Sequence, residues 1–143
     1  MAKQKQQTVL EMIFLGIGRG IWWLIKLPFT GLKRKAKLSV ADQQYLISKR
    51  NEILSLLSSE NQLELRHAVM EADKLADWIL KKKGYVGETF ADRLRSAEKD
   101  IPKESYNNIW QGHKIRNQIA HENAEISHQT LRVAIKNILS ING

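Results

Sequence analysis

Polar side chains that suit phosphate chemistry gather near the end of one predicted helix, between residues 110 and 121. His113, Asn117 and His121 are four residues apart, so in a helix they share one face, and Arg116 lies beside that face. A guanidinium can hold phosphoryl oxygens, and an imidazole can move a proton near neutral pH. The segment therefore indicates a candidate site for phosphate chemistry. A solvated helix face or a hydrogen-bonded helix end is the other interpretation of the same spacing.

The composition points away from metal and thiol chemistry. The chain has no cysteine, which excludes disulfides, zinc knuckles and thiol nucleophiles. Asn117 stands where a histidine pair at i and i+4 needs its second member, so the helix does not carry the usual zinc-binding pattern. We therefore expect no metal and no cofactor.

The element that carries these residues is predicted to belong to an all-α domain. From Ser39 onward the apolar residues recur at intervals of three and four, which is the helical period. Capping-box spacing marks helix starts at Ser39, Ser59 and Thr89. The predicted helices cover roughly residues 40–57, 60–83, 89–98, 106–121 and 127–141. Because the connections are short, we expect a compact antiparallel bundle of about five helices.

Two local features of these helices follow from the sequence. In the first helix, the residues expected among the buried positions are Tyr45, Ile53, Leu56 and Leu57. The second helix ends in three lysines, 81 to 83, followed by Gly84. Lysines suit the negative end of the helix dipole and glycine suits the cap, so this triplet indicates a helix C-terminus rather than an RNA-binding patch.

The positive charge of the chain is concentrated at its N-terminus. The formal net charge is +8, from 23 basic and 15 acidic residues. Residues 1–38 hold 8 basic residues and 1 acidic residue, a net of +7 (8 − 1), which leaves +1 for residues 39–143 (15 − 14). The sequence thus divides into a basic arm, 1–38, and a nearly neutral helical domain, 39–143. The domain therefore lacks the excess positive charge that attracts nucleic acid irrespective of sequence.

The arm has the pattern of a membrane-associating helix. Its apolar stretch, residues 8–29, forms an aliphatic face at helical spacing, while Glu11, Arg19 and Lys26 share a narrow sector on the other side. A basic cluster follows and marks the cytoplasmic side. The residues predicted to associate with the membrane are Ile13, Phe14, Ile17, Ile21, Trp22, Trp23, Lys33, Arg34, Lys35 and Lys37. The helix either lies in the interface or spans the bilayer once with the C-terminal domain in the cytoplasm; packing on the domain or on a partner is the remaining alternative.

The run from Arg116 to His121 reads R-N-Q-I-A-H and resembles the signature of the HEPN superfamily, the higher eukaryotes and prokaryotes nucleotide-binding domain. That signature is an arginine, a polar residue and a histidine after four to six intervening positions, late in an all-α bundle. A wider string, from Glu71 to Glu122, is similar to small bacterial HEPN-like proteins, and the resemblance covers about residues 40–141.

The resemblance implies a metal-independent endoribonuclease in which two protomers line one cleft. By this resemblance, Arg116 would bind and polarise the scissile phosphate, and His121 would be general base or acid. Asn117 would orient substrate or hold His121. His113 and Lys114 are candidate auxiliary phosphate contacts. Many HEPN domains are non-catalytic, so a membrane-tethered dimerisation, protein-interaction or nucleotide-binding module is the alternative function. The expected partners are a second copy of the chain, RNA or a nucleotide, the membrane surface through residues 8–37, and an antitoxin or other protein in a toxin or defence setting.

Overall fold

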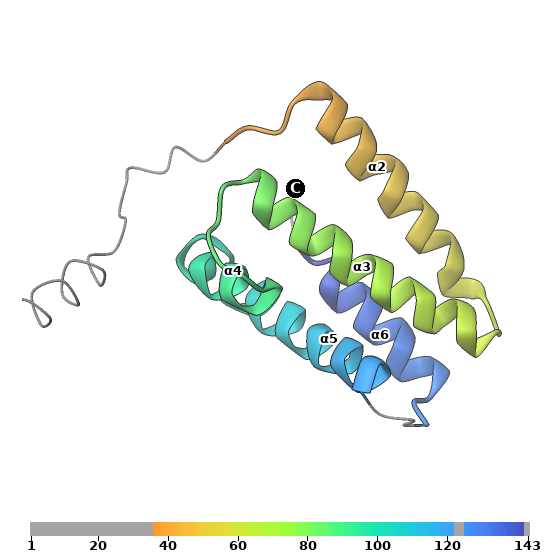
Figure 1. The fold of residues 1–143 in the computed structure, drawn as a ribbon. Helices are drawn as coiled ribbons and strands as arrows, with labels where there is room; N and C mark the ends of the chain where they lie inside the picture. The colour runs from red at the N-terminus through yellow and green to blue at the C-terminus, as the bar shows by residue number, and fades with distance from the viewer. Residues whose placement is uncertain (1–35, 122–124, 142–143) are drawn as a thin grey trace, which may run out of the picture. The chain divides into compact units, whose positions relative to one another are not determined.

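The computed structural model describes residues 36–121 and 125–141, which fall within one compact unit (Figure 1). These residues form five α-helices and no strand, which confirms the all-α bundle. The helices are α2 (Val40–Ser55), α3 (Gln62–Lys82), α4 (Phe90–Ser96), α5 (Lys103–His121) and α6 (His128–Ile138), with short 3₁₀ turns η1 (Leu56–Ser58) and η2 (Glu98–Asp100).

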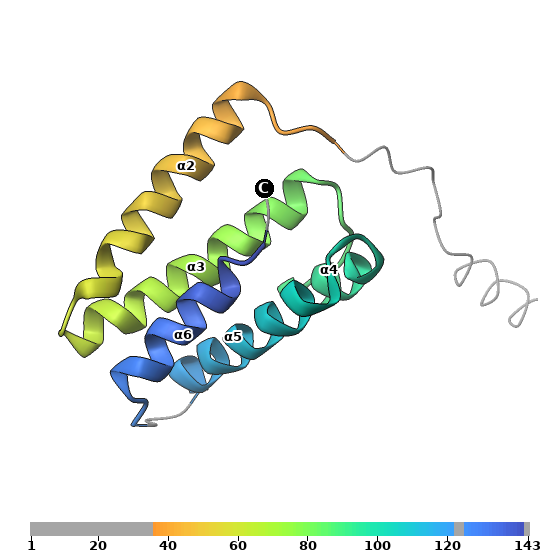
Figure 2. The same ribbon diagram turned by 180° about the vertical axis from the view of Figure 1, so that it is seen from behind.

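Three helices, α3, α5 and α6, surround the core, and α2 lies along the side of α3 away from α5 in both views (Figures 1 and 2). α3 contributes most of the fully buried apolar side chains because its apolar residues keep the helical period over its whole length. The buried apolar side chains of α3 are Leu65, Ala68, Val69, Ala72, Leu75, Ala76, Ile79 and Leu80, and those of α6 are Leu131, Ala134, Ile135 and Ile138.

The close approach of α5 to α6 depends on Gly112. A Cβ at this position would collide with the Ile138 side chain and would lie 2.8 Å from the backbone oxygen of Ala134. Backbone atoms of a packed helix cannot give way locally as a flexible side chain can. The absence of a side chain at Gly112 therefore allows α5 and α6 to pack this closely.

The helix ends follow the predicted capping chemistry at two of three starts. Ser39 and Thr89 each form a complete capping box, with Asp42 and Asp92 respectively. The start predicted at Ser59 is wrong, because Asn61 caps α3 by accepting a hydrogen bond from the Leu63 amide at 2.9 Å.

The lysine triplet does form a helix C-terminus. α3 ends at Lys82, and Gly84 follows with a φ of 83°, in the left-handed region. The amides of Gly84 and Tyr85 donate to the carbonyl oxygens of Lys81 and Leu80, both at 3.0 Å, which is the Schellman motif. A residue with a Cβ would be strained at position 84, so glycine is required for this ending.

α2 contacts the rest of the bundle less than its sequence pattern predicts. Ile53 is buried as expected, but it is the one fully buried residue of this helix, and Tyr45 is 47% exposed. Leu56 and Leu57 lie in the turn η1 and are only partly buried. The Tyr45 ring lies on Trp78 of α3, with ring centroids 4.8 Å apart. The expectation of a buried Tyr45 was wrong because α2 has a helical neighbour on one side only.

The membrane prediction falls almost wholly on residues outside those described. Of the ten residues predicted to associate with the membrane, Lys37 is described, and it is exposed. Among residues 36–121 and 125–141, no helix has the length and apolar character needed to span a bilayer.

Candidate functional site

A chain of polar side chains connects α3 to α5 in the otherwise apolar core. Asp73 of α3 lies 2.7 Å from Nδ1 of His113, measured from its Oδ1. Nε2 of His113 lies 3.2 Å from Nδ2 of Asn117, and Nη1 of Arg116 donates to Oδ1 of Asn117 at 3.1 Å. The second oxygen of Asp73 lies 3.5 Å from Nε of Arg116, so the four side chains close into a ring.

The donors and acceptors in this ring have one consistent direction. Arginine can only donate, so the oxygen of the Asn117 amide must face Arg116 and its NH₂ group must face His113. Nε2 of His113 then accepts, and Nδ1 carries the proton that is donated to the Asp73 carboxylate. The ring therefore orients the His113 imidazole from both sides, with Nδ1 donating and Nε2 accepting.

Apolar groups surround the buried part of the ring. Asp73 is 6% exposed and His113 is 9% exposed. The His113 ring lies against Phe90 of α4 and Trp110 of α5, with ring centroids 4.7 Å and 6.0 Å away. A carboxylate in such a place is costly unless it is paired and hydrogen-bonded, so Asp73, His113 and Arg116 depend on one another for stability.

Arg116 lies at the edge of the ring, between the core and solvent. Its side chain is 30% exposed, although Nε is buried and has no hydrogen-bond partner among the described residues. Asp73 and Asn117 hold the guanidinium from two sides. The arrangement leaves an arginine that is both fixed in position and accessible from outside.

His121 is the last residue of α5 and is exposed. Because α5 is one continuous helix from Lys103 to His121, Arg116 and His121 lie about 140° apart around its axis and about 7.5 Å apart along it. His121 is thus on the same helix as the ring but is not one of its four members.

His113 and Lys114, the two residues predicted to contact substrate, lie in different surroundings. Both ring nitrogens of His113 are engaged by Asp73 and Asn117 within the protein. Lys114 is exposed on the surface of α5 and is not part of the ring. The structure therefore brings His113, Arg116 and Asn117 together, and leaves Lys114 and His121 at the surface.

Asp73 is the member of the ring that the sequence motif does not include. It lies in the apolar stripe of α3, four residues after Val69 and three before Ala76, both fully buried. A carboxylate at a position that the helical period assigns to the core requires a buried partner. The presence of a charged residue at a core position is therefore the sequence feature that could have identified Asp73.

A second, partly buried ion pair joins α4 to the same part of α3. Arg93 of α4 donates through Nε to Asp77 at 2.6 Å and through Nη1 to the Gly87 backbone oxygen. Burial alone would raise the pKa of Asp77, but the hydrogen bonds from Arg93 and Lys81 outweigh it, so this pKa lies below its ordinary value. The pair holds α4, and with it the Phe90 ring, against the ring of polar side chains.

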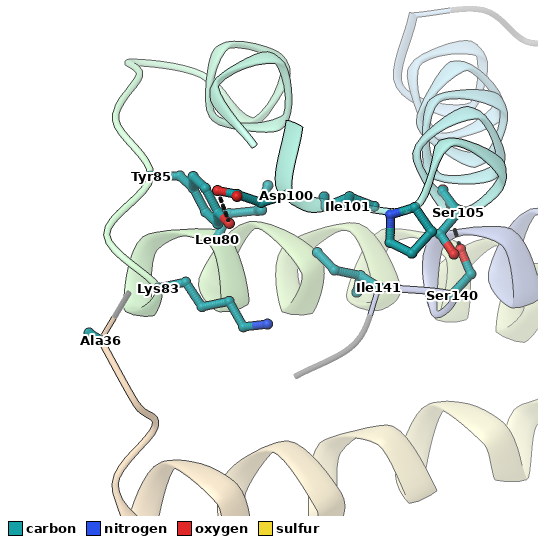
Figure 3. A pocket seen from close by; sticks show the side chains of 10 residues that line it. Ala36, Leu80, Lys83, Tyr85, Asp100, Ile101, Ser105, Ser140 and Ile141 are labelled. Atoms are coloured by element: carbon teal, nitrogen blue, oxygen red, sulfur yellow. Dashed lines mark hydrogen bonds between the residues drawn. The ribbon is translucent and has the colours of Figure 1, made fainter. Parts of the chain in front are cut away.

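A small pocket lies at the other end of α5 (Figure 3). Its volume is about 180 Å³, and its lining includes Tyr85, Asp100, Ser105 and Ile141. The Tyr85 hydroxyl donates to Asp100 at 3.0 Å, and burial together with that carboxylate raises the pKa of Tyr85 to about 12. Ser105 precedes Arg116 by about 16 Å along the helix, so this pocket is separate from the ring.

Within the described part of the chain, no cluster of three or more histidine or carboxylate side chains is arranged to hold a metal ion. Comparisons of this chain with protein families, with characterised proteins and with solved structures give no match.

Proposed function

We propose that residues 39–143 form a HEPN-type, metal-independent endoribonuclease that acts as a homodimer and is held at the cytoplasmic face of a membrane by residues 8–37. The observation that carries the proposal is the state of Arg116. It is fixed by Asp73 and Asn117, yet 30% of its side chain remains exposed. A cation held in this way can bind a phosphate without first losing side-chain freedom, which is the advantage of a preorganised site.

In the proposed reaction, Arg116 binds the non-bridging oxygens of the scissile phosphate and stabilises the negative charge that develops there. His121 takes the proton from the ribose 2′-hydroxyl, and the 2′-oxygen attacks phosphorus. The bond from phosphorus to the 5′-oxygen breaks, and that oxygen takes up the proton that His121 accepted from the 2′-hydroxyl. The products are a 2′,3′-cyclic phosphate and a free 5′-hydroxyl.

Asn117 and His113 act on Arg116 rather than on RNA in this proposal. Asn117 accepts from Nη1 of Arg116, and His113 fixes the Asn117 amide from behind. Asp73 completes the support by orienting His113 and pairing with Arg116. These three residues are positioning residues, and Arg116 and His121 are the catalytic residues.

The proposal requires two copies of the chain. Arg116 and His121 lie about 140° apart around α5, so a phosphate held by one is turned away from the other within a single protomer. A two-fold contact can bring Arg116 of one protomer opposite His121 of its partner. The homodimer is therefore part of the mechanism and not an accessory to it.

A second candidate function is a non-catalytic dimerisation, protein-interaction or nucleotide-binding module. The observation that favours it is the pairing of Arg116 with Asp73, which neutralises part of the charge that RNA binding needs. Residues 39–143 also carry a net charge of only +1 (15 − 14). In a toxin or defence setting, such a module would act through an antitoxin or another protein partner.

RNA cleavage by purified protein separates the two functions. The wild type, Arg116→Ala and His121→Ala are each incubated with a labelled RNA in the presence of a chelator. Gln118→Ala is the matched control, because Gln118 is exposed on α5 between the two catalytic residues. The nuclease predicts cyclic-phosphate products from the wild type and the control and none from the other two variants. Intact RNA in every sample, or equal cleavage by all four proteins, would refute it.

A further inference from the structure

A cation–π contact joins α4 to α5 at the surface of the bundle. The guanidinium carbon of Arg95 lies over the Trp110 ring, 5.3 Å from its centroid. Nη1 of Arg95 also donates to Oδ1 of Asp92 at 3.1 Å, so the guanidinium is held from two sides. The Arg95 side chain is nevertheless 63% exposed. The contact therefore presents a fixed, planar cation to solvent.

Trp110 is in turn fixed beneath Arg95 by aromatic neighbours. Its ring meets the Tyr106 and His113 rings nearly edge-on, with centroids 6.2 Å and 6.0 Å away. The half-buried Trp110 side chain also packs against the core of the bundle. His113 is one of the four side chains in the polar ring that holds Arg116. The Arg95–Trp110 pair thus borders the candidate site directly.

The face of α5 around Trp110 is cationic and polar. The residues of α5 that lie within about 40° of Trp110 around the axis are Lys103, Tyr106, Lys114, Asn117 and His121. Lys103, Lys114 and His121 are exposed. Glu104, the only carboxylate of α5, lies about 120° away from Trp110. A row of cations beside an aromatic ring suits the phosphates and bases of a single nucleic-acid strand.

We propose that Arg95 and Trp110 form a stacking site for one unpaired base of RNA, and that the strand runs from there along α5 to His121 of the same protomer. Guanidinium planes and aromatic rings both stack bases in RNA-binding proteins. The base lies on the outer plane of Arg95, which Trp110 supports from beneath. Lys114 stands between Trp110 and His121, which are about 16 Å apart along the axis, and it binds the intervening phosphates.

The stacking site deepens the proposed nuclease and rests on it for the choice of RNA as the ligand. A base in a duplex is stacked on both of its faces, so only an unpaired base can lie on Arg95. The substrate class is therefore single-stranded RNA. Stacking also supplies affinity that residues 39–143 cannot obtain from bulk attraction, because their net charge is only +1 (15 − 14).

Binding of an RNA analogue that cannot be cleaved tests the stacking site in the full chain. The probe is a fluorescently labelled, 2′-O-methylated RNA strand. Its anisotropy gives the Kd in salt above about 0.2 M, where binding through phosphates alone is weak. Arg95→Ala should weaken binding of the single strand about fivefold or more, which is the effect of losing one stacked base. The duplex of the same sequence should bind more weakly than the strand, and equally to the wild type and the variant.

Two comparisons separate stacking from charge and from folding. Arg95→Lys keeps the charge but has no plane, so it should bind the strand nearly as weakly as Arg95→Ala. Lys136→Ala is the matched control, because it removes an exposed positive charge on α6, and it should bind as the wild type does. Trp110→Phe should bind more tightly than Trp110→Leu, because it keeps an aromatic ring beneath Arg95. The Arg95 variants change an exposed side chain, so their result does not depend on the core.

Three results would each overturn the stacking site. These are wild-type affinity in Arg95→Lys, equal losses in Arg95→Ala and Lys136→Ala, and equal affinity of the wild type for strand and duplex. The analogue has no 2′-hydroxyl to attack phosphorus, so the affinities are independent of catalysis. Tight, Arg95-dependent binding without cleavage of ordinary RNA would refute the nuclease and keep the stacking site. Cleavage of ordinary RNA by Arg95→Ala at the wild-type kcat/KM would do the reverse.

Discussion

Asp73 of α3 accepts a hydrogen bond from Nδ1 of His113 of α5 at 2.7 Å, and both residues are at least 91% buried. The pair joins two helices of the core and fixes the direction of every hydrogen bond from His113 to Arg116. Asp73 thereby links the stability of the fold to the position of the proposed catalytic arginine.

Replacing Asp73 should weaken the fold and the site together. Asp73→Ala leaves His113 and Arg116 without their shared carboxylate, and breaking a buried pair of this kind costs about 3 kcal/mol. Urea unfolding measures the loss. Lys74→Ala is the control, because the Lys74 side chain is 68% exposed, and it should change the free energy of unfolding by less than about 0.5 kcal/mol. Equal stabilities for the two variants would contradict the role of Asp73.

Adding one methyl group at Gly112 should separate α5 from α6. Gly112→Ala brings a Cβ against Ile138 and the Ala134 backbone, and overpacking of this kind costs about 1–3 kcal/mol. Thermal unfolding should show a lower Tm for Gly112→Ala. The neighbouring Gln111→Ala, at an exposed position of the same helix, should keep the wild-type Tm. An unchanged Tm for Gly112→Ala would mean that the two helices are not in close contact.

Acid should destabilise the bundle in part through Asp77. The Arg93 and Lys81 hydrogen bonds lower its pKa from the ordinary 3.8 despite burial, so the unfolded chain takes up the proton more readily than the folded chain. The stabilisation by this carboxylate is present above about pH 4 and is lost as the pH falls through the lowered value. Urea midpoints at pH 6 and pH 3 should differ less in Asp77→Asn than in the wild type. A variant with the full wild-type difference would show that Asp77 does not contribute.

Removal of residues 1–38 should release the protein from membranes. The deletion takes away the apolar stretch predicted to associate with the membrane and the basic cluster that follows it. Each basic residue of that cluster is expected to contribute about 1 kcal/mol at an anionic surface. Sedimentation with vesicles that contain an anionic lipid measures the change. Alanine at Lys33, Arg34, Lys35 and Lys37 is the milder variant and should weaken binding to anionic vesicles more than to neutral ones. Unchanged sedimentation of the deletion variant would refute the membrane prediction.

The sequence predicted where helices begin better than it predicted which helices pack against one another. Capping chemistry is local, so the boxes at Ser39 and Thr89 were visible in the sequence. Ser59 had the same spacing, but it failed because Asn61, two residues later, competes for the same helix start. Tyr45 lies at an apolar position of α2 but is 47% exposed, since the helical period identifies a face without saying whether another helix covers it.

The candidate site was also predicted only in part, because a sequence pattern reports local features and not tertiary contacts. Arg116 and Asn117 stand next to one another in the sequence, so a local motif identifies both. Asp73 is 40 residues from His113, and only the packing of α3 on α5 brings the two together. A local pattern cannot identify a contact that tertiary packing creates, which is why His113 was assigned to substrate without its buried partner.

In the proposed nuclease, each active site combines Arg116 of one protomer with His121 of its partner. Subunit mixing tests this arrangement: Arg116→Ala and His121→Ala, each inactive alone, are mixed in equal amounts and allowed to exchange. Half of the dimers are then mixed, and each holds one intact pair where a wild-type dimer holds two. RNA cleavage is therefore expected at about one quarter of the wild-type rate. A mixture as inactive as its components, beside an active wild type, would contradict it.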